Sequence, residues 1–277
     1  MPRIVQVTDT HLSADYPAYV QNWEVCAARI RALAPDLVVN TGDISFNGAD
    51  SEADLAFAKA RHDALGLPWL AIPGNHDIGD CANGDGSPAK QEILPERRQR
   101  YRRIFGDDWW CHDIAGWRLI GINAQLFASG MPEEAEQWSF LEDAVAGGTE
   151  GRVVLFLHRP LFAHEASVDG ETQRYVNQPF KNRLLQLVRR YRVGTVCTGH
   201  THQWLSVSDR GTSYYWSPST AFIIGDSLQP IIGEKTVGFL SLDLRDDGVT
   251  VDLLRPDGLI RHDIVQAKRS VPDTGSA

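Results

Sequence analysis

Potential metal ligands follow five short apolar runs of this sequence, at the points where the runs stop. Each run is rich in Val, Ile or Leu, which indicates a buried strand. The groups that follow are carboxylates, one carboxamide and imidazoles, and all of these bind transition metals. The runs and the residues after them are 4–7 with Asp9 and His11, 37–39 with Asp43, 69–72 with Asn75, His76 and Asp77, 153–157 with His158, and 193–197 with His200 and His202.

These donors are too numerous for one metal ion. A four-coordinate ion takes about three or four protein ligands, so two ions that share a carboxylate would use the set fully. Two ions about 3.5–4 Å apart are typical of enzymes that cleave phosphoesters. The donors include no thiolate, which disfavours a structural zinc site, and they suit Mn, Fe, Zn, Ni or Co.

The elements that must position these donors are parallel strands. Helical patterns at 20–33 and 53–65 separate the first three runs, and this alternation predicts βαβ units. The carboxyl ends of parallel strands open onto one crevice, so residues far apart in sequence can meet there. Gly42, Gly74 and Gly199 directly precede ligand-bearing residues, where the backbone is expected to approach the site closely.

Each donor alone has an ordinary explanation. An Asp after a strand is more often a turn former or helix cap, and a single His is more often a hydrogen-bonded core or surface residue. The coincidence of five strand endings favours the metal site.

The second half of the sequence predicts two more helices and then hairpins. The helical patterns span 131–145 and 180–191. Beyond residue 203, Asp-Arg-Gly, Asp-Asp-Gly and Pro-Asp-Gly turns separate short alternating runs, which predicts antiparallel hairpins. The runs are 204–208, 213–216, 237–244, 249–254 and 259–265.

Composition excludes several classes of protein. The 277 residues carry 27 Lys and Arg against 36 Asp and Glu, and the net charge of −9 argues against broad nucleic-acid binding. No apolar stretch is long enough to span a membrane and no signal peptide precedes the first run, so we expect a cytoplasmic protein. The scattered cysteines, Cys26, Cys81, Cys111 and Cys197, are expected to be reduced core thiols. One domain is expected over residues 1–265, followed by a flexible tail at 266–277.

The ligand motifs resemble the full signature of the calcineurin-like metallophosphoesterase family. The resemblance covers about residues 1–265 and implies an α/β fold, a four-layer αββα sandwich of two mixed sheets flanked by helices. It also implies a centre of two divalent or trivalent transition-metal ions, such as Mn, Fe or Zn. The motifs are Asp9-x-His11, Gly42-Asp43, Gly74-Asn75-His76-Asp77, His158 and Gly199-His200-x-His202.

The resemblance also implies roles for individual residues. It places Asp43 as a bridge between the two ions, His76 near the leaving group and Asp77 as the orienting partner of His76. One ion would be held by Asp9, His11, Asp43 and His202, and the other by Asp43, Asn75, His158 and His200.

Within the family, the sequence looks most like the bacterial class III cyclic-nucleotide phosphodiesterases, partly through the segment 217–222. It departs from many relatives at Arg159, where they have a second His, and in its long stretch at 78–105. We expect attack of a metal-bound hydroxide on a small phosphodiester. The alternatives are a phosphomonoesterase and a catalytically silent scaffold. Family resemblance and the aromatic-rich segment 214–222 also raise the expectation of a homodimer.

Several features keep two interpretations. Arg159 could hold a phosphate oxygen or turn away to a carboxylate, and His164 could line the crevice. The basic run from Arg97 to Arg103 could attract an anionic substrate or form a solvated helix face. The irregular region 77–109 could be a lid over the site or a plain surface loop.

Overall fold

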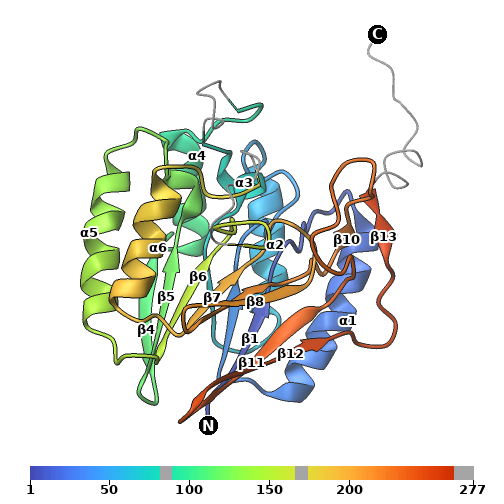
Figure 1. Cartoon of the computed structure of the whole chain (residues 1–277). Coiled ribbons are helices and arrows are strands. Elements are labelled where there is room, and N and C mark those ends of the chain that lie inside the picture. Colours follow the sequence, from blue (N-terminus) through green and yellow to red (C-terminus); the bar gives the residue numbers. More distant parts are fainter. Residues whose placement is uncertain (82–88, 166–173, 265–277) are drawn as a thin grey trace.

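The protein is a sandwich of two β-sheets between two layers of helices (Figure 1). The computed structural model describes residues 1–81, 89–165 and 174–264. The expected tail at 266–277 and part of the segment 78–105 lie outside these residues. Within the described residues, no helix is both long and apolar enough to cross a membrane.

The first sheet has five strands in the order β12-β11-β1-β2-β3. β1, β2 and β3 run parallel, while β11 is antiparallel to both β1 and β12. The parallel strands are continuous apolar runs because both faces of this sheet are covered. The strand bounds are β1 Arg3–Val7, β2 Leu37–Asn40, β3 Trp69–Ala71, β11 Phe239–Arg245 and β12 Gly248–Leu254.

The second sheet has six strands in the order β4-β5-β6-β7-β9-β8. Its middle strands β5, β6, β7 and β9 run parallel, and β4 and β8 are antiparallel edges. The strand bounds are β4 Trp110–Ile114, β5 Trp117–Ile122, β6 Val153–Leu157, β7 Thr195–Thr198, β8 Leu205–Asp209 and β9 Thr212–Trp216.

Helices cover the outer face of each sheet. Figure 1 shows α5 and α6 on one side of the sandwich and α1 on the other. Local sequence fixes several helix starts: Pro17 opens α1, and the Ser51 side chain accepts a hydrogen bond from the backbone N–H of Asp54 at the start of α2. The helices are α1 Pro17–Leu33, α2 Glu52–Asp63, α3 Asn75–Ile78, α4 Pro95–Phe105, α5 Glu133–Ala146 and α6 Phe180–Arg190, with a 3₁₀ turn at Ala124–Leu126.

The layers are joined by three large apolar clusters. One lies between the two sheets and contains Ile4, Val39, Phe156 and Leu240. The others lie between each sheet and its own helices. Burial on both faces makes the sheets a rigid support, so the loops at their strand ends are held in fixed positions. The expected four-layer fold is confirmed.

Two parts of the fold differ from the sequence expectations. The β4–β5 hairpin was not expected from the sequence, because the exposed edge strand β4 carries Cys111, His112 and Asp113 instead of an apolar run. The expected hairpin after the Pro-Asp-Gly turn is wrong, because β13 (His262–Asp263) pairs in parallel with β10 (Phe222–Ile223). All four cysteines are free, and Cys111 is the exposed one.

Candidate metal centre

The five strand endings with polar residues meet at one edge of the sandwich. Three endings come from the first sheet (β1, β2 and β3) and two from the second (β6 and β7). Direct contacts join the two sets: His158 Nε2 lies 3.4 Å from Asp43 Oδ2, and the His200 backbone N–H donates to Asp9 Oδ2 at 2.9 Å. The crevice expected from parallel strands is therefore formed by both sheets together.

The backbone is strained at these positions. Among the described residues, ten that are not glycine have a positive φ, and five of the ten are predicted ligands. Such conformations cost about 1–3 kcal/mol each and persist only where the surroundings enforce them. The five are Asp9, His11, Asp43, His200 and His202, with φ between 44° and 66°.

The three glycines before the ligands are needed for close packing, as expected. A Cβ at Gly74 would lie 2.2 Å from Asp43 Oδ1, and one at Gly199 would lie 2.7 Å from Asp9 Oδ2. At Gly42, which has a φ of +103°, a Cβ would lie 2.6 Å from His158 Nδ1. Any larger residue would displace the side chain of Asp9, Asp43 or His158.

One group of donors comprises Asp9, His11 and His202, all buried. His202 Nε2 lies 3.2 Å from Asp9 Oδ1 and 3.3 Å from His11 Nε2. The other ring nitrogen of His202 donates to the Phe222 carbonyl at 2.8 Å. This bond leaves Nε2 as the donor that faces the centre.

A second group comprises Asp43, His158 and His200. His158 Nδ1 donates to the Thr41 carbonyl at 2.8 Å, which again leaves Nε2 turned inward. This Nε2 lies 3.1 Å from His200 Nδ1. Asp43 also reaches the first group, since its Oδ2 is 3.8 Å from His11 Nε2. Asp43 therefore lies between the two groups, where a bridging carboxylate is expected.

Two side-chain oxygens without hydrogen-bond partners support metal binding at this site. Asp9 Oδ1 and Asn75 Oδ1 are buried and have no hydrogen-bond partner among the described residues. Buried polar atoms are normally satisfied because leaving one unpaired costs about 1–3 kcal/mol. A cation at the centre would satisfy both oxygens, so the residues present fit a metal.

The protonation of the centre reflects its crowding. Burial disfavours the charged carboxylates, yet the nearby imidazoles outweigh it and lower the pKa of Asp9 and Asp43. Burial likewise opposes a charged His158, but Asp43 raises its pKa to about 9. In His200, burial and the neighbouring His158 both lower the pKa. In the metal-free protein the carboxylates are therefore anionic while His158 carries a proton at neutral pH, and metal binding at its Nε2 would release that proton.

His76 and Asp77 differ in their relation to this centre. His76 forms a further group with His11 and Asp43, and its ring lies edge-on to His11 with 4.6 Å between centroids. Its Nδ1 donates to the Phe46 carbonyl at 2.6 Å. Asp77 is not its orienting partner, which corrects that expectation. The four hydrogen bonds to the Asp77 carboxylate come from the backbone N–H groups of Ile44, Ser45 and Gly74 and from the Ser45 hydroxyl.

The Arg159 side chain points away from the donor groups and pairs with a carboxylate, and this ion pair lies inside the protein. The side chain is 2% exposed and forms an ion pair with Asp80. The basic run is paired as well, so it is not a free cationic surface. Arg102 and Arg103 lie on an exposed, solvated face, whereas Arg98 is buried. The partners are Asp50 for Arg97, Asp108 for Arg98, the Gly48 and Ala49 carbonyls for Arg100, Asp107 for Arg102 and Glu52 for Arg103.

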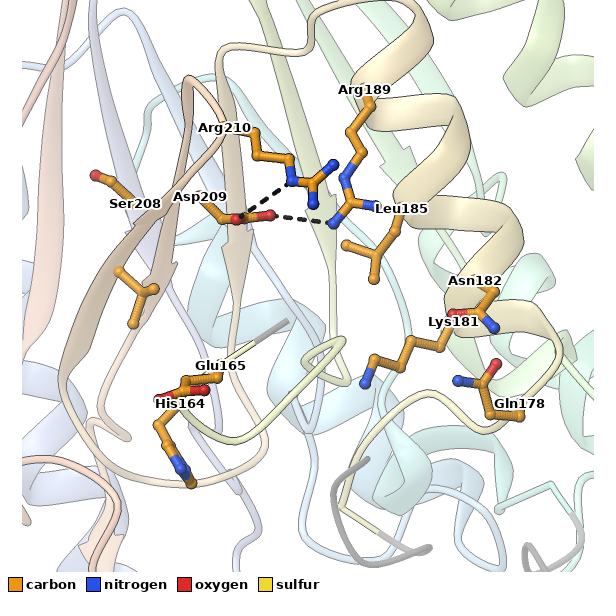
Figure 2. Close-up of a pocket in the computed structure, with 11 residues that line it drawn as sticks. His164, Glu165, Gln178, Lys181, Asn182, Leu185, Arg189, Ser208, Asp209 and Arg210 are labelled. Carbon is orange, nitrogen blue, oxygen red and sulfur yellow. Dashed lines mark hydrogen bonds and ion pairs between the residues drawn. The ribbon is translucent and has the colours of Figure 1, made fainter. Parts of the chain in front are cut away.

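His164 lies at a different place from the metal ligands. It lines a separate cavity of about 700 Å³ beside α6 and β8, which shares no lining residue with the donor groups. Figure 2 shows Arg189 and Arg210 directed at Asp209 on one wall of this cavity. His164, which could have lined the crevice, lies on this separate cavity and belongs to none of the donor groups found among the described residues.

Sequence reasoning missed the groups that orient the ligands. Most of these are backbone groups, which leave no signal in the residue type. They are the carbonyls of Thr41, Phe46 and Phe222 and the N–H groups of His76 and His200. The exception is Thr8, whose hydroxyl donates to Asp9 Oδ2 at 2.7 Å. Its place directly before Asp9 is the only sequence signal for it.

Comparison with known proteins agrees with this geometry. Residues 2–204 match the family model described as Calcineurin-like phosphoesterase, and the chain belongs to that family. Its members are metal-dependent hydrolases of phosphoesters. The chain is 27% identical to the 3',5'-cyclic adenosine monophosphate phosphodiesterase CpdA of Escherichia coli, over 89% of this chain and 86% of the relative.

One further sequence relative and one solved structure are also similar to the chain. A probable glycerophosphodiester phosphodiesterase, GpdQ of Arcobacter nitrofigilis, is 28% identical over 72% of this chain and 71% of its own length. The structure of the purple acid phosphatase PPD1 from yellow lupin seeds superimposes with a TM-score of 0.63 at 16% identity. That match covers 95% of this chain and 52% of the lupin chain, and it shows the fold alone.

Proposed function

We propose that this protein is a binuclear metal-dependent phosphodiesterase that hydrolyses small phosphodiesters, such as a cyclic nucleotide. The observation that carries the proposal is the position of Asp43 between two groups of donors, one with Asp9 and the other with His158. One carboxylate between two ligand sets is the arrangement that a pair of ions requires.

The proposed metal ligands fall into two sets that share one residue. Asp9, His11 and His202 would hold one ion, Asn75, His158 and His200 the other, and Asp43 both. When bound, such ions stabilise charge on phosphoryl oxygens and lower the pKa of water. Their positions depend on the carbonyls that orient the imidazoles, so the protein supplies a preformed, rigid site.

His76 is the residue placed to handle a proton. Its Nδ1 is held by the Phe46 carbonyl, which leaves Nε2 available beside His11 and Asp43. From this position the imidazolium would donate a proton to the departing alkoxide. Asp77 supports the site indirectly, because its carboxylate ties Gly74 to Ile44 and Ser45 and so fixes the loops that carry Asn75 and Asp43.

Two observations support a diester as the substrate. A cavity of about 540 Å³ adjoins Asn75 and His76 and is lined by polar residues including Asn47, Gln91 and Arg97. This volume accommodates the second alcohol of a diester. In addition, the relatives CpdA and GpdQ are both named as phosphodiesterases.

The proposal is tested by comparing substrates on metal-depleted and metal-loaded protein. We expect bis(p-nitrophenyl) phosphate and cyclic AMP to be hydrolysed faster than p-nitrophenyl phosphate with Mn²⁺, and no hydrolysis after chelation. A faster monoester reaction would assign a phosphomonoesterase instead. Absence of both bound metal and hydrolysis would leave a scaffold protein.

Asp43→Asn tests the bridge. Because Asp43 reaches both donor groups, this variant should lose both ions, as measured by elemental analysis after dialysis. Full retention of metal would reject the bridging role.

A further inference from the structure

A chain of buried polar contacts leads from Arg159 toward Asn75. Arg159 directly follows His158 at the end of β6, and its guanidinium is 2% exposed. It forms an ion pair with the Asp80 carboxylate, and its Nη1 lies 2.9 Å from Cys81 Sγ. These contacts bind the end of β6 to the segment that follows α3.

Gln125 continues the chain of contacts. It is fully buried in the 3₁₀ turn after β5. In the orientation that satisfies both ends of its amide, its nitrogen donates to Asp80 Oδ1 at 2.9 Å and its oxygen accepts from the Asn75 backbone N–H at 3.3 Å. Asp80 is therefore held from two sides, and the Asn75 backbone is held by Gln125.

These contacts fix the positions of two predicted ligands, Asn75 and His158, relative to each other. Asn75 follows a strand of the first sheet and His158 a strand of the second, and Arg159, Asp80 and Gln125 connect the segments that carry them. The Asn75 side-chain oxygen has no other partner among the described residues, so its position depends on its backbone. Since residues behind the ligands typically change metal affinity 10–100-fold, a connection of this kind has a measurable effect.

We propose that Arg159, Asp80 and Gln125 are positioning residues that set the affinity of the ion held by Asn75, His158 and His200. They do so by fixing Asn75 relative to His158, without contact with the ion. This inference rests on the proposed binuclear centre. It also gives Arg159 a role other than binding a substrate phosphate.

The test follows each ion separately. Metal-free protein is titrated with Co²⁺, and the visible absorption and bound cobalt are measured for the wild type and for Gln125→Leu, which removes both amide contacts without changing charge. We expect two binding steps in the wild type. In the variant, the step that Asn75→Ala also affects should weaken about 10–100-fold, while the step affected by Asp9→Asn should stay unchanged.

A double variant separates positioning from general damage. If Gln125 acts through Asn75, then Asn75→Ala/Gln125→Leu should bind cobalt at that step no more weakly than Asn75→Ala alone. Additive losses would overturn the inference. Arg159→Gln should reproduce the selective loss, and Arg159→Lys, which keeps the charge, should recover part of it.

The control is an ion pair at the opposite end of β1 from the donors. Arg3 Nε donates to Asp243 Oδ1 at 2.8 Å, at the start of the strand. Arg3→Gln should lower the thermal stability of the metal-free protein, yet leave both cobalt steps intact.

The outcomes distinguish the two proposals. A wild type that binds fewer than two cobalt ions refutes the binuclear centre and this inference with it. A wild type with two steps, combined with no change or an equal change of both steps in Gln125→Leu, refutes the positioning role alone.

Discussion

The Asp9 carboxylate is held by the backbone of His200, 191 residues later in the chain. Asp9 Oδ2 accepts hydrogen bonds from the His200 N–H at 2.9 Å and from the Thr8 hydroxyl at 2.7 Å. The opposite oxygen, Oδ1, is left unpaired and lies 3.2 Å from His202 Nε2. One oxygen of Asp9 thus orients the side chain, and the other faces His202, where the proposed ion would bind.

This division predicts the behaviour of Asp9→Asn. The amide can keep one contact to the loop but no longer supplies a charged ligand. We expect the ion shared with His11 and His202 to bind more than about 100-fold more weakly, since even substitutions behind the ligands cost 10–100-fold. Cobalt titration of the metal-free protein measures this loss. Loss of both ions would show instead that the two sites cannot fill independently.

His76→Ala should lower kcat without loss of metal. Removal of a proton donor typically costs about 10²–10⁴-fold, while the remaining donors still hold both ions. Rates on bis(p-nitrophenyl) phosphate and elemental analysis of the same sample measure the two quantities. His164→Ala is the control, because His164 lines the separate cavity beside α6 and should change neither. Metal lost together with activity would make His76 a ligand.

Gly74→Ala should disrupt the centre by steric clash, without backbone strain. The φ of Gly74 is −102°, which alanine tolerates, but the new Cβ would lie 2.2 Å from Asp43 Oδ1. We therefore expect loss of bound metal with a retained fold, measured by metal content and circular dichroism. In Gly66→Ala the Cβ meets nothing within 4 Å, although φ is +67°. That control should lose about 1–2 kcal/mol of stability and keep its metal.

A buried histidine outside the centre predicts a pH effect on stability. His62 is fully buried, with Nδ1 2.9 Å from the Ala58 carbonyl and Nε2 2.9 Å from Asn40 Nδ2. Burial lowers its pKa to about 4. The unfolded chain takes up this proton near pH 6.5, whereas the folded protein takes it up only near pH 4, so stability must fall as the pH falls between these values.

The magnitude follows from the size of the shift. About 2.5 pH units correspond to about 3 kcal/mol at full protonation of the unfolded state. Urea unfolding of metal-free wild type and His62→Gln between pH 7 and 4 measures the effect as the difference in slope. Equal slopes would contradict the prediction.

The donor groups that the structure brings together could be picked from the sequence because their chemistry is carried by side chains. The residue types of Asp43 and His158 identify them as possible metal ligands, and the apolar run before each one predicts that it lies at a strand end. The same logic fails for Asp77, because a carboxylate can serve a metal, an imidazole or backbone N–H groups with equal ease. Only the positions of Ile44, Ser45 and Gly74 decide that it binds the backbone.

Strand pairing was harder to predict than strand location. The Pro-Asp-Gly turn at 256–258 is a local signal, but the partner of β13 is β10, which precedes it by some forty residues in the chain. A turn tripeptide cannot report such a distant pairing. Likewise, the aromatic residues Tyr214, Trp216 and Phe222 are buried within this chain, so the feature that suggested a dimer surface belongs to the core.

The donors come from strand ends of both sheets, with Asp9, Asp43 and Asn75 on one side and His158, His200 and His202 on the other. A cation bound among them would link the two sheets, which otherwise contact each other through an apolar interface. Separating the sheets would break coordination, so metal release and unfolding would be thermodynamically linked, and chelators would act on this protein as mild denaturants.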